Sequence, residues 1–182
     1  MRKILLTSTG FDNDNIKNKF LSLLNKNISE VKVLFVITAA QDPGAVRILS
    51  GCLEDLTKCN ISDDNITIYD MHKKLDINEI NKYDAIYVCG GCTKYLVQRM
   101  DEINFKEQVN EYLNNGGIYI GVSAGTIAVS GKYPNEFNLL NNVVDVHCEN
   151  GNINGIIDYE DDISLTDNQA IYIDDDKSII FE

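Results

Sequence analysis

Short apolar runs alternate with helix-like segments over the first two thirds of the chain, and this alternation constrains the fold more than any other feature. The runs have the length and nearly continuous apolar character of strands buried on both faces. They lie at residues 3–8, 32–38, 66–69, 84–89 and 118–120. Segments with apolar residues at helical spacing separate them, at residues 14–26, 43–56, 94–100 and 105–114. The alternation predicts an α/β fold, a three-layer sandwich with a mostly parallel central sheet and helices on both faces.

Two of the expected helices carry clear end signals. Asp42 offers an N-cap acceptor, and Pro43 suits the first helical position of the segment that follows. At the other end of the series, Gly116 and Gly117 are suited to ending the helix expected at residues 105–114. These signals place helix boundaries on either side of predicted strands and so support the alternation.

The pattern changes beyond Val129. Short strands are expected at residues 143–147, 170–174 and 178–181, and an acidic turn joins the last two. Such a turn predicts a small antiparallel appendage at the C-terminal end. The sequence shows no repeat and no low-complexity linker, and 182 residues are enough for one compact core. We therefore expect a single domain over residues 1–182.

Charge and composition exclude several classes of function. The net charge is −12, and residues 61–182 hold eight Lys and Arg against 22 Asp and Glu. Such a surface repels polyphosphates, so nucleic acid is not an expected partner, and a solvated acidic face is favoured over a dedicated cation site. No apolar run has the length of a signal peptide or a membrane span. Five cysteines, an odd number, argue against a disulfide framework and predict a cytoplasmic protein.

The pentapeptide Gly121-Val122-Ser123-Ala124-Gly125 follows an apolar run and precedes a segment able to start a helix. A serine on a sharp strand-to-helix turn needs small neighbours, because its backbone is strained and pressed against adjacent segments. That geometry exposes the hydroxyl as a nucleophile. An ordinary strand-end turn would use the same small residues, and the short pattern alone leaves both interpretations open.

A serine nucleophile needs a base, and the chain offers only His72 and His147. His147 is favoured, since it follows the serine in an expected strand, whereas His72 has the features of a surface residue. A carboxylate would then orient the imidazole. Between Ser123 and His147 the carboxylates are Glu136, in a loop-like stretch, and Asp145, whose side chain should run parallel to that of His147. Glu136 is preferred over Asp145, although a solvated loop carboxylate is nearly as good an interpretation of it.

A second glycine pair occurs in Cys89-Gly90-Gly91-Cys92-Thr93, at the end of a predicted buried strand. Glycines there allow close backbone approach and can leave N–H groups free. The N–H groups of Gly91 and Ala124 would together form an oxyanion hole. The same stretch is a C-x-x-C motif, but the chain has no second cysteine pair to complete a zinc site, and redox use is disfavoured. No metal or organic cofactor is expected.

These features together resemble serine peptidases of the dipeptidase E (aspartyl dipeptidase) type, peptidase family S51, which share the fold of class I glutamine amidotransferases. The resemblance rests on residues 3–8, on the Gly-Gly-x-Thr turn at residues 90–93 with the Tyr-Leu pair that follows, and on residues 121–125. Residues 145–147 fit the downstream histidine. The resemblance implies Ser123 as nucleophile, His147 as base, and Gly91 with Ala124 as the oxyanion hole. It also implies hydrolysis of short peptides with an N-terminal aspartate.

The chain departs from that family pattern in four ways. Cys92 stands where the family usually has asparagine, and the interval of 24 residues between serine and histidine is short. The acidic member of the triad has no clean counterpart. An aspartate-binding pocket also needs a cation, and only Lys177 follows the histidine, although Arg47 and Arg99 occur earlier.

Other functions compete with that of a serine peptidase. An α/β-hydrolase esterase shares the pentapeptide but normally needs more chain after the serine for its acid and histidine. A glutamine amidotransferase would carry cysteine at position 123. A catalytically degenerate relative that binds a small ligand or partner protein is the main alternative, because of the trimmed loop and the acidic C-terminal third. A short peptide is the expected substrate, and the oligomeric state is left open, with a homodimer as one option.

Overall fold

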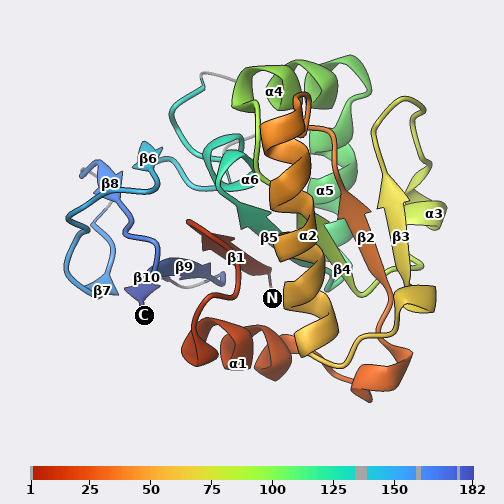
Figure 1. The fold of residues 1–182 in the computed structure, drawn as a ribbon, viewed down its shortest axis with the longest axis horizontal. Coiled ribbons are helices and arrows are strands. Elements are labelled where there is room, and N and C mark those ends of the chain that lie inside the picture. The colour runs from red at the N-terminus through yellow and green to blue at the C-terminus, as the bar shows by residue number, and fades with distance from the viewer. Residues whose placement is uncertain (1, 134–138, 159–160, 176) are drawn as a thin grey trace.

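The computed structural model describes residues 2–133, 139–158, 161–175 and 177–182. Its centre is an eight-stranded sheet with the order β3-β2-β4-β5-β1-β9-β10-β7 (Figure 1). The first five strands in this order run parallel. Their bounds are β3 Ile66–Tyr69, β2 Val33–Val36, β4 Ala85–Val88, β5 Ile118–Val122 and β1 Lys3–Thr7. The predicted mostly parallel α/β sheet is confirmed.

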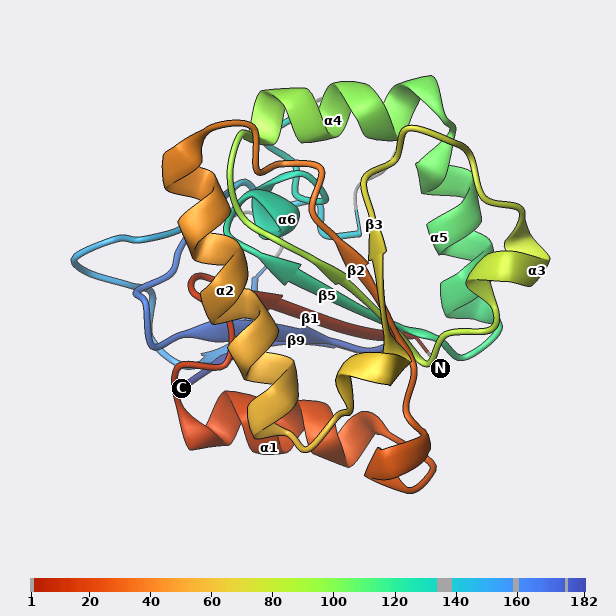
Figure 2. The same cartoon turned by 45° about the vertical axis from the view of Figure 1, so that its right-hand side comes forward.

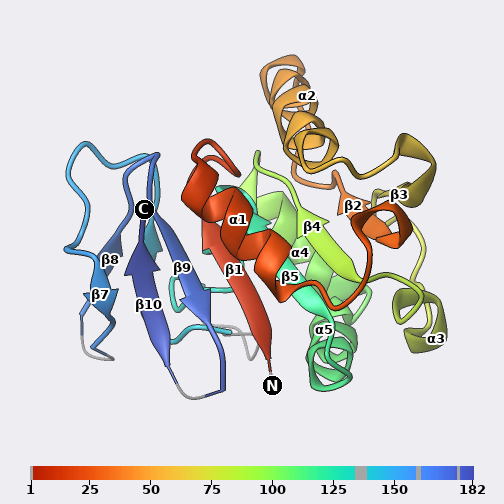
Figure 3. The ribbon, with the colours of Figure 1, turned by 90° about the horizontal axis from the view of Figure 1, so that it is seen from below.

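Helices cover both faces of the sheet, and Figures 2 and 3 show α2 and α5 on opposite sides of the strands. One face packs against α1 (Asp14–Leu23) and α2 (Pro43–Lys58), and the other against α4 (Thr93–Glu102), α5 (Phe105–Asn114) and the short α6 (Ala124–Ile127). Alternate residues of each strand serve the two layers: Val33 and Phe35 join the α1–α2 core, whereas Leu34 and Val36 join the other. Because side chains alternate between the two faces of each strand, the sheet can pack against a helical layer on both sides.

The helix signals in the sequence act as expected. The carboxylate of Asp42 accepts hydrogen bonds from the N–H groups of Gly44 (2.8 Å) and Ala45 (3.0 Å), and Pro43 occupies the first helical position of α2. Shorter helical elements connect the rest: the 3₁₀ turns η1 (Ile28–Glu30) and η2 (Asp63–Asn65), and α3 (Ile77–Ile80). No helix among the described residues has the length and apolar character needed to cross a membrane.

The C-terminal strands extend the main sheet. In Figure 3, β9 (Ala170–Ile173) and β10 (Ser178–Phe181) continue the sheet beyond β1, and β7 (Gly155–Ile156) pairs with β10. These pairings are antiparallel, as predicted for the end of the chain. A separate two-strand pair, β6 (Val144–Asp145) with β8 (Ile163–Ser164), is parallel. The strand expected at residues 143–147 is thus limited to two residues.

Candidate active site

Ser123 occupies a sharp turn between β5 and α6. Its backbone has φ 48° and ψ −105°, a conformation that L residues rarely adopt and that marks strain at functional positions. The turn is held on β1, because the N–H of Ser123 donates to the carbonyl of Thr7 (3.1 Å). The hydroxyl of Thr126 donates to the carbonyls of Thr7 (2.8 Å) and Gly121 (2.9 Å). Ser123 is therefore fixed at the carboxyl ends of two neighbouring central strands.

The glycines on either side of Ser123 are required by close backbone contacts. A Cβ atom at Gly121 would lie 2.7 Å from the carbonyl oxygen of Gly125. At Gly125 it would lie 2.3 Å from the carbonyl oxygen of Val88, in β4. Both distances are far below van der Waals contact with backbone atoms that cannot move aside. Small residues in this pentapeptide thus serve a strained, tightly packed turn.

The Gly90-Gly91 turn lies directly beside Ser123. A Cβ atom at Gly90 would approach the Cβ of Ser123 to 3.2 Å. Gly91 has φ +137°, and a Cβ there would lie 2.2 Å from the carbonyl oxygen of Ala39. Ala124 is the first residue of α6, where the helix itself offers its N–H no acceptor. The two N–H groups predicted as an oxyanion hole therefore belong to turns at the same sheet edge as Ser123.

His147 contacts Ser123 through its imidazole ring. Its Nε2 lies 3.0 Å from Oγ of Ser123, a hydrogen-bond distance. The residue follows β6 and has φ 58°, so it is not part of the strand that the sequence indicated. Its own N–H donates to the hydroxyl of Ser8 (2.8 Å), which follows β1. The backbone of His147 is thus tied to the same central strand that holds the serine.

Asp167 is the carboxylate that contacts the other imidazole nitrogen, with Oδ1 2.7 Å from Nδ1 of His147. The hydroxyl of Ser8 donates to the same Oδ1 (3.1 Å), and the hydroxyl of Thr9 donates to the Asp167 carbonyl (2.7 Å). Ser123, His147 and Asp167 therefore form a continuous hydrogen-bonded chain with the geometry of a serine–histidine–carboxylate triad. The side chains of His147 and Asp167 are 48% and 59% exposed, so this chain of contacts opens to solvent.

Asp167 is not among the residues predicted from the sequence, because the predicted carboxylates lie between the serine and the histidine, whereas Asp167 follows the histidine. The polar turn at residues 166–168 directly precedes the expected strand at 170–174, but it points to the site only when the pairing of that strand is known. That strand, β9, pairs with β1 in a register that sets Ala170 opposite Thr7. The antiparallel register carries the residues before Ala170 toward Ser8 and Thr9, and so toward the site.

The other candidate side chains do not join this arrangement. Asp145 forms an ion pair with Lys132, and His72 lies 3.6 Å from Asp70. Glu136, the third triad residue preferred on the sequence, lies outside the described residues. The position expected for it, at Nδ1 of His147, is taken by Asp167.

Within the described residues, Cys89 and Cys92 belong to no group of side chains that could hold a metal ion. Among the residues that the structure describes, no group of three or more His, Cys, Asp or Glu is arranged to hold a metal ion. Burial raises the pKa of the Cys89 thiol well above its ordinary value, which keeps the sulfur protonated. Cys92 is exposed, and all five cysteines are free thiols.

Comparisons with known proteins identify the family of the chain and solved structures that share its fold. Residues 4–144 match the model of peptidase family S51. A protein from Listeria monocytogenes EGD-e, described as a "Putative Peptidase E Protein", superposes with a TM-score of 0.76 at 20% identity and covers 100% of this chain and 98% of its own. A peptidase from an acI-B1 Actinobacterium superposes with a TM-score of 0.66 at 13% identity, over 100% of this chain and 87% of its own. No curated protein matches the chain. At these identities the two structural likenesses concern the fold.

Proposed function

Because the chain belongs to peptidase family S51, we propose that it is a serine peptidase that cleaves short peptides. Ser123 is the nucleophile and His147 the general base. One observation carries the proposal: the contact of 3.0 Å between Ser123 Oγ and His147 Nε2, continued by the contact of 2.7 Å between His147 Nδ1 and Asp167. This is the arrangement that activates a serine hydroxyl, which is a weak nucleophile without an adjacent base.

The proposed reaction proceeds through an acyl-enzyme. Nε2 of His147 takes the hydroxyl proton as Ser123 Oγ attacks the peptide carbonyl, while Asp167 stabilises the imidazolium through Nδ1–H. The carbonyl oxygen becomes an oxyanion, which the N–H groups of Gly91 and Ala124 stabilise. His147 then protonates the leaving amine. Water, deprotonated by the same imidazole, attacks the acyl-enzyme and releases the acid.

Preference for an N-terminal aspartate is the finer part of the proposal, and it needs a cation near the site. Arg99 bonds the carbonyl of Met71 and pairs with Glu102, and Lys132 pairs with Asp145. Arg47, in the first turns of α2, is exposed and has no carboxylate partner within the described residues. We propose Arg47 as the residue that contacts the substrate side chain, because α2 begins four residues after Ala39, whose carbonyl accepts the N–H of Cys92 beside the Gly90-Gly91 turn. The free state of all five cysteines supports a reducing compartment, and we propose the cytoplasm.

A fluorophosphonate probe tests the nucleophile. The wild-type protein should be labelled, and Ser123→Ala should not be, whereas Ser22→Ala, on the exposed face of α1, should label normally. Turnover of a dipeptide panel should fall by about 10⁴-fold or more in Ser123→Ala. Asp-Xaa peptides should be cleaved faster than Ala-Xaa peptides, and Arg47→Gln should reduce that preference.

The alternative of a catalytically degenerate binder predicts a different set of results. The wild-type protein would then show neither labelling nor hydrolysis of any dipeptide, while dipeptides would still raise its Tm. Equal labelling of wild type and Ser123→Ala would instead refute Ser123 as the nucleophile.

A further inference from the structure

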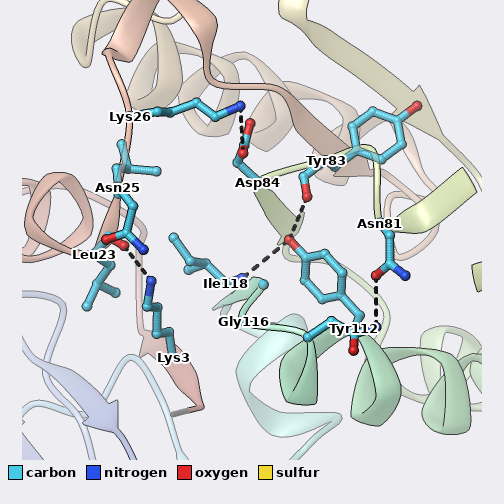
Figure 4. Close-up of a pocket in the computed structure, with 13 residues that line it drawn as sticks. Lys3, Leu23, Asn25, Lys26, Asn81, Tyr83, Asp84, Tyr112, Gly116 and Ile118 are labelled. Atoms are coloured by element: carbon cyan, nitrogen blue, oxygen red, sulfur yellow. Dashed lines mark hydrogen bonds and ion pairs between the residues drawn. The ribbon is translucent and has the colours of Figure 1, made fainter. Parts of the chain in front are cut away.

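A pocket lies at the edge of the sheet opposite the candidate active site. Ser123 and the Gly90-Gly91 turn follow the carboxyl ends of β5 and β4, whereas this pocket lies where β1, β4 and β5 begin (Figure 4). Its volume is about 440 Å³, within the range of small-molecule sites. The two sites are therefore separated by the length of the central strands and share no residue.

Lys3, the first residue of β1, supplies the pocket with a buried cation. The residue is 9% exposed, and its Nζ donates to the carbonyl of Leu23 at the end of α1 (2.9 Å). In the part of the chain that the structure describes, no carboxylate lies within 4.0 Å of this nitrogen. The other lysine of the pocket, Lys26, is paired with Asp84 at 2.8 Å. The pocket thus holds one cation without a counter-charge.

The contact with Leu23 explains only part of this arrangement. A lysine near a helix C-terminus is favoured by the helix dipole, and the carbonyl uses one of the three donors of the ammonium. A buried charge is costly unless it is paired and hydrogen-bonded. Because Lys3 lines the pocket, an anion bound there can accept hydrogen bonds from the two remaining donors of its ammonium.

The remaining walls suit a small polar molecule. Figure 4 shows Lys3 and Asn25 on one side of the pocket and Tyr112 with Asn81 on the other. The Tyr112 hydroxyl donates to the carbonyl of Tyr83 (3.3 Å) and accepts from the N–H of Ile118 (3.3 Å), which fixes the ring. A third amide, that of Asn115, also lines the pocket. Amides offer both donors and acceptors and carry no charge. The ammonium of Lys3 can therefore neutralise one negative charge on a bound molecule.

We propose that this pocket binds a small organic carboxylate of amino-acid size, whose carboxylate pairs with Nζ of Lys3. The amides of Asn25, Asn81 and Asn115 contact its polar body. Free amino acids and simple dicarboxylic acids share this chemistry. Charge-assisted hydrogen bonds to a part-buried ammonium are short and strong, whereas the rest of this acidic protein repels anions.

Calorimetry and amide NMR of the full chain test the proposal with L-alanine, succinate and sodium sulfate as probes. Binding of either carboxylate, with shifts at the amides of Gly116 and Ile118 and not at those of Gly91 and Ala124, supports it. Binding of alanine alone identifies amino acids as the source, and binding of succinate alone identifies amine-free acids. No binding of either at about 10 mM, or tighter binding of sulfate than of both, overturns the proposal.

Two variants disrupt the proposed pairing between the ammonium of Lys3 and the carboxylate of the ligand in different ways. Lys3→Met deletes the cation, and Asn25→Glu places a carboxylate beside it at an exposed position that the fold tolerates. Each should weaken carboxylate binding by about 10-fold or more. The controls are Lys82→Met and Asn18→Glu, which make the same substitutions outside the pocket and should bind normally. Peptidase turnover should stay unchanged in all four. Asn25→Glu keeps the test valid if Lys3→Met fails to fold, and unchanged affinity in Asn25→Glu refutes the site.

Discussion

The two halves of the candidate active site are built in different ways. Ser123 lies in a turn packed against β1 and β4, and the close backbone contacts at positions 121 and 125 leave room only for glycine. His147 and Asp167 lie on connecting segments at the C-terminal side, and about half of each side chain is exposed. The match to the family model also ends at residue 144, so it includes Ser123 but neither His147 nor Asp167. The nucleophile is positioned by close backbone packing as well as by hydrogen bonds, whereas its base is positioned by hydrogen bonds on half-exposed segments.

Ser8 joins the two halves. It directly follows β1, the strand whose Thr7 accepts the N–H of Ser123. Its hydroxyl accepts the N–H of His147 and donates to Asp167. The exposed half therefore takes its position from the same central strand as the buried half. Substitutions of His147 or Asp167, in the exposed half, should therefore impair turnover and leave the fold intact.

Asp167→Asn should reduce turnover more than any other substitution in the exposed half apart from loss of His147 itself. Asparagine cannot stabilise the imidazolium and favours the wrong tautomer of His147, which in buried triads costs about 10⁴-fold in kcat. Because Asp167 is 59% exposed, water can partly replace it, and we expect a loss of about 10² to 10³-fold. The measurement is kcat on the best dipeptide, with Tm unchanged.

The matched controls are the two carboxylates that the sequence favoured. Asp145→Asn removes the ion pair with Lys132 and should change kcat by less than a few fold, since exposed ion pairs contribute little. Glu136→Gln should do the same. A loss in Glu136→Gln equal to that in Asp167→Asn would contradict the assignment of Asp167.

The sequence was informative where local chemistry decides the structure. Asp42 and Pro43 start α2 as predicted, and the strand expected at residues 66–69 and the helix expected at residues 105–114 match β3 and α5. Ser123, Gly91 and Ala124 could be named because a strained turn needs small residues close together in the chain. These features depend on propensity, capping and steric limits, all of which can be seen within a few residues.

Asp167 could not be found in that way, because its contact with His147 spans 20 residues and depends on tertiary register. The pairing of β9 with β1 brings Asp167 to Ser8, and no local pattern encodes that pairing. β6 also ends at Asp145, and His147 has a left-handed backbone, in a segment whose alternation favoured a longer strand. Tertiary contacts override local preference here.

Asp55 makes the stability of the fold depend on pH, at a buried site away from the triad. Its carboxylate is buried in α2 and accepts hydrogen bonds from the Tyr87 hydroxyl (2.6 Å) and the N–H of Phe11 (2.9 Å), in the loop that begins at Ser8. Burial raises the pKa of Asp55 from 3.8 to about 6, although both hydrogen bonds oppose the shift. Between these two values the folded protein binds more protons than the unfolded chain, so this group lowers stability as pH rises from about 4 to about 6.

Asp55→Asn keeps an oxygen that can accept from the Tyr87 hydroxyl and the Phe11 N–H, and it removes the titratable carboxyl group. Relative to wild type, the variant should therefore gain free energy of unfolding as pH rises from about 4 to about 6, by up to about 3 kcal/mol. Urea unfolding at several pH values measures this difference. Its pH profile of kcat should match that of wild type, because Asp55 does not contact the triad. A constant difference in unfolding free energy across this range would contradict the raised pKa.

Ser8→Ala should reduce turnover less than Asp167→Asn does, and it is the most direct test of the link between the halves. Loss of its hydroxyl leaves the N–H of His147 and one lone pair of Asp167 without a partner, but the contact between Nδ1 and Asp167 can persist. We expect kcat to fall by about 10-fold with KM unchanged, in keeping with one lost hydrogen bond to a charged group. A merely structural role would lower Tm without moving the NMR signal of the Nδ1 proton of His147, whereas a positioning role should shift that signal. Ser22→Ala is the matched control. Unchanged kcat together with an unchanged Nδ1 signal would show that the exposed half holds its geometry without β1.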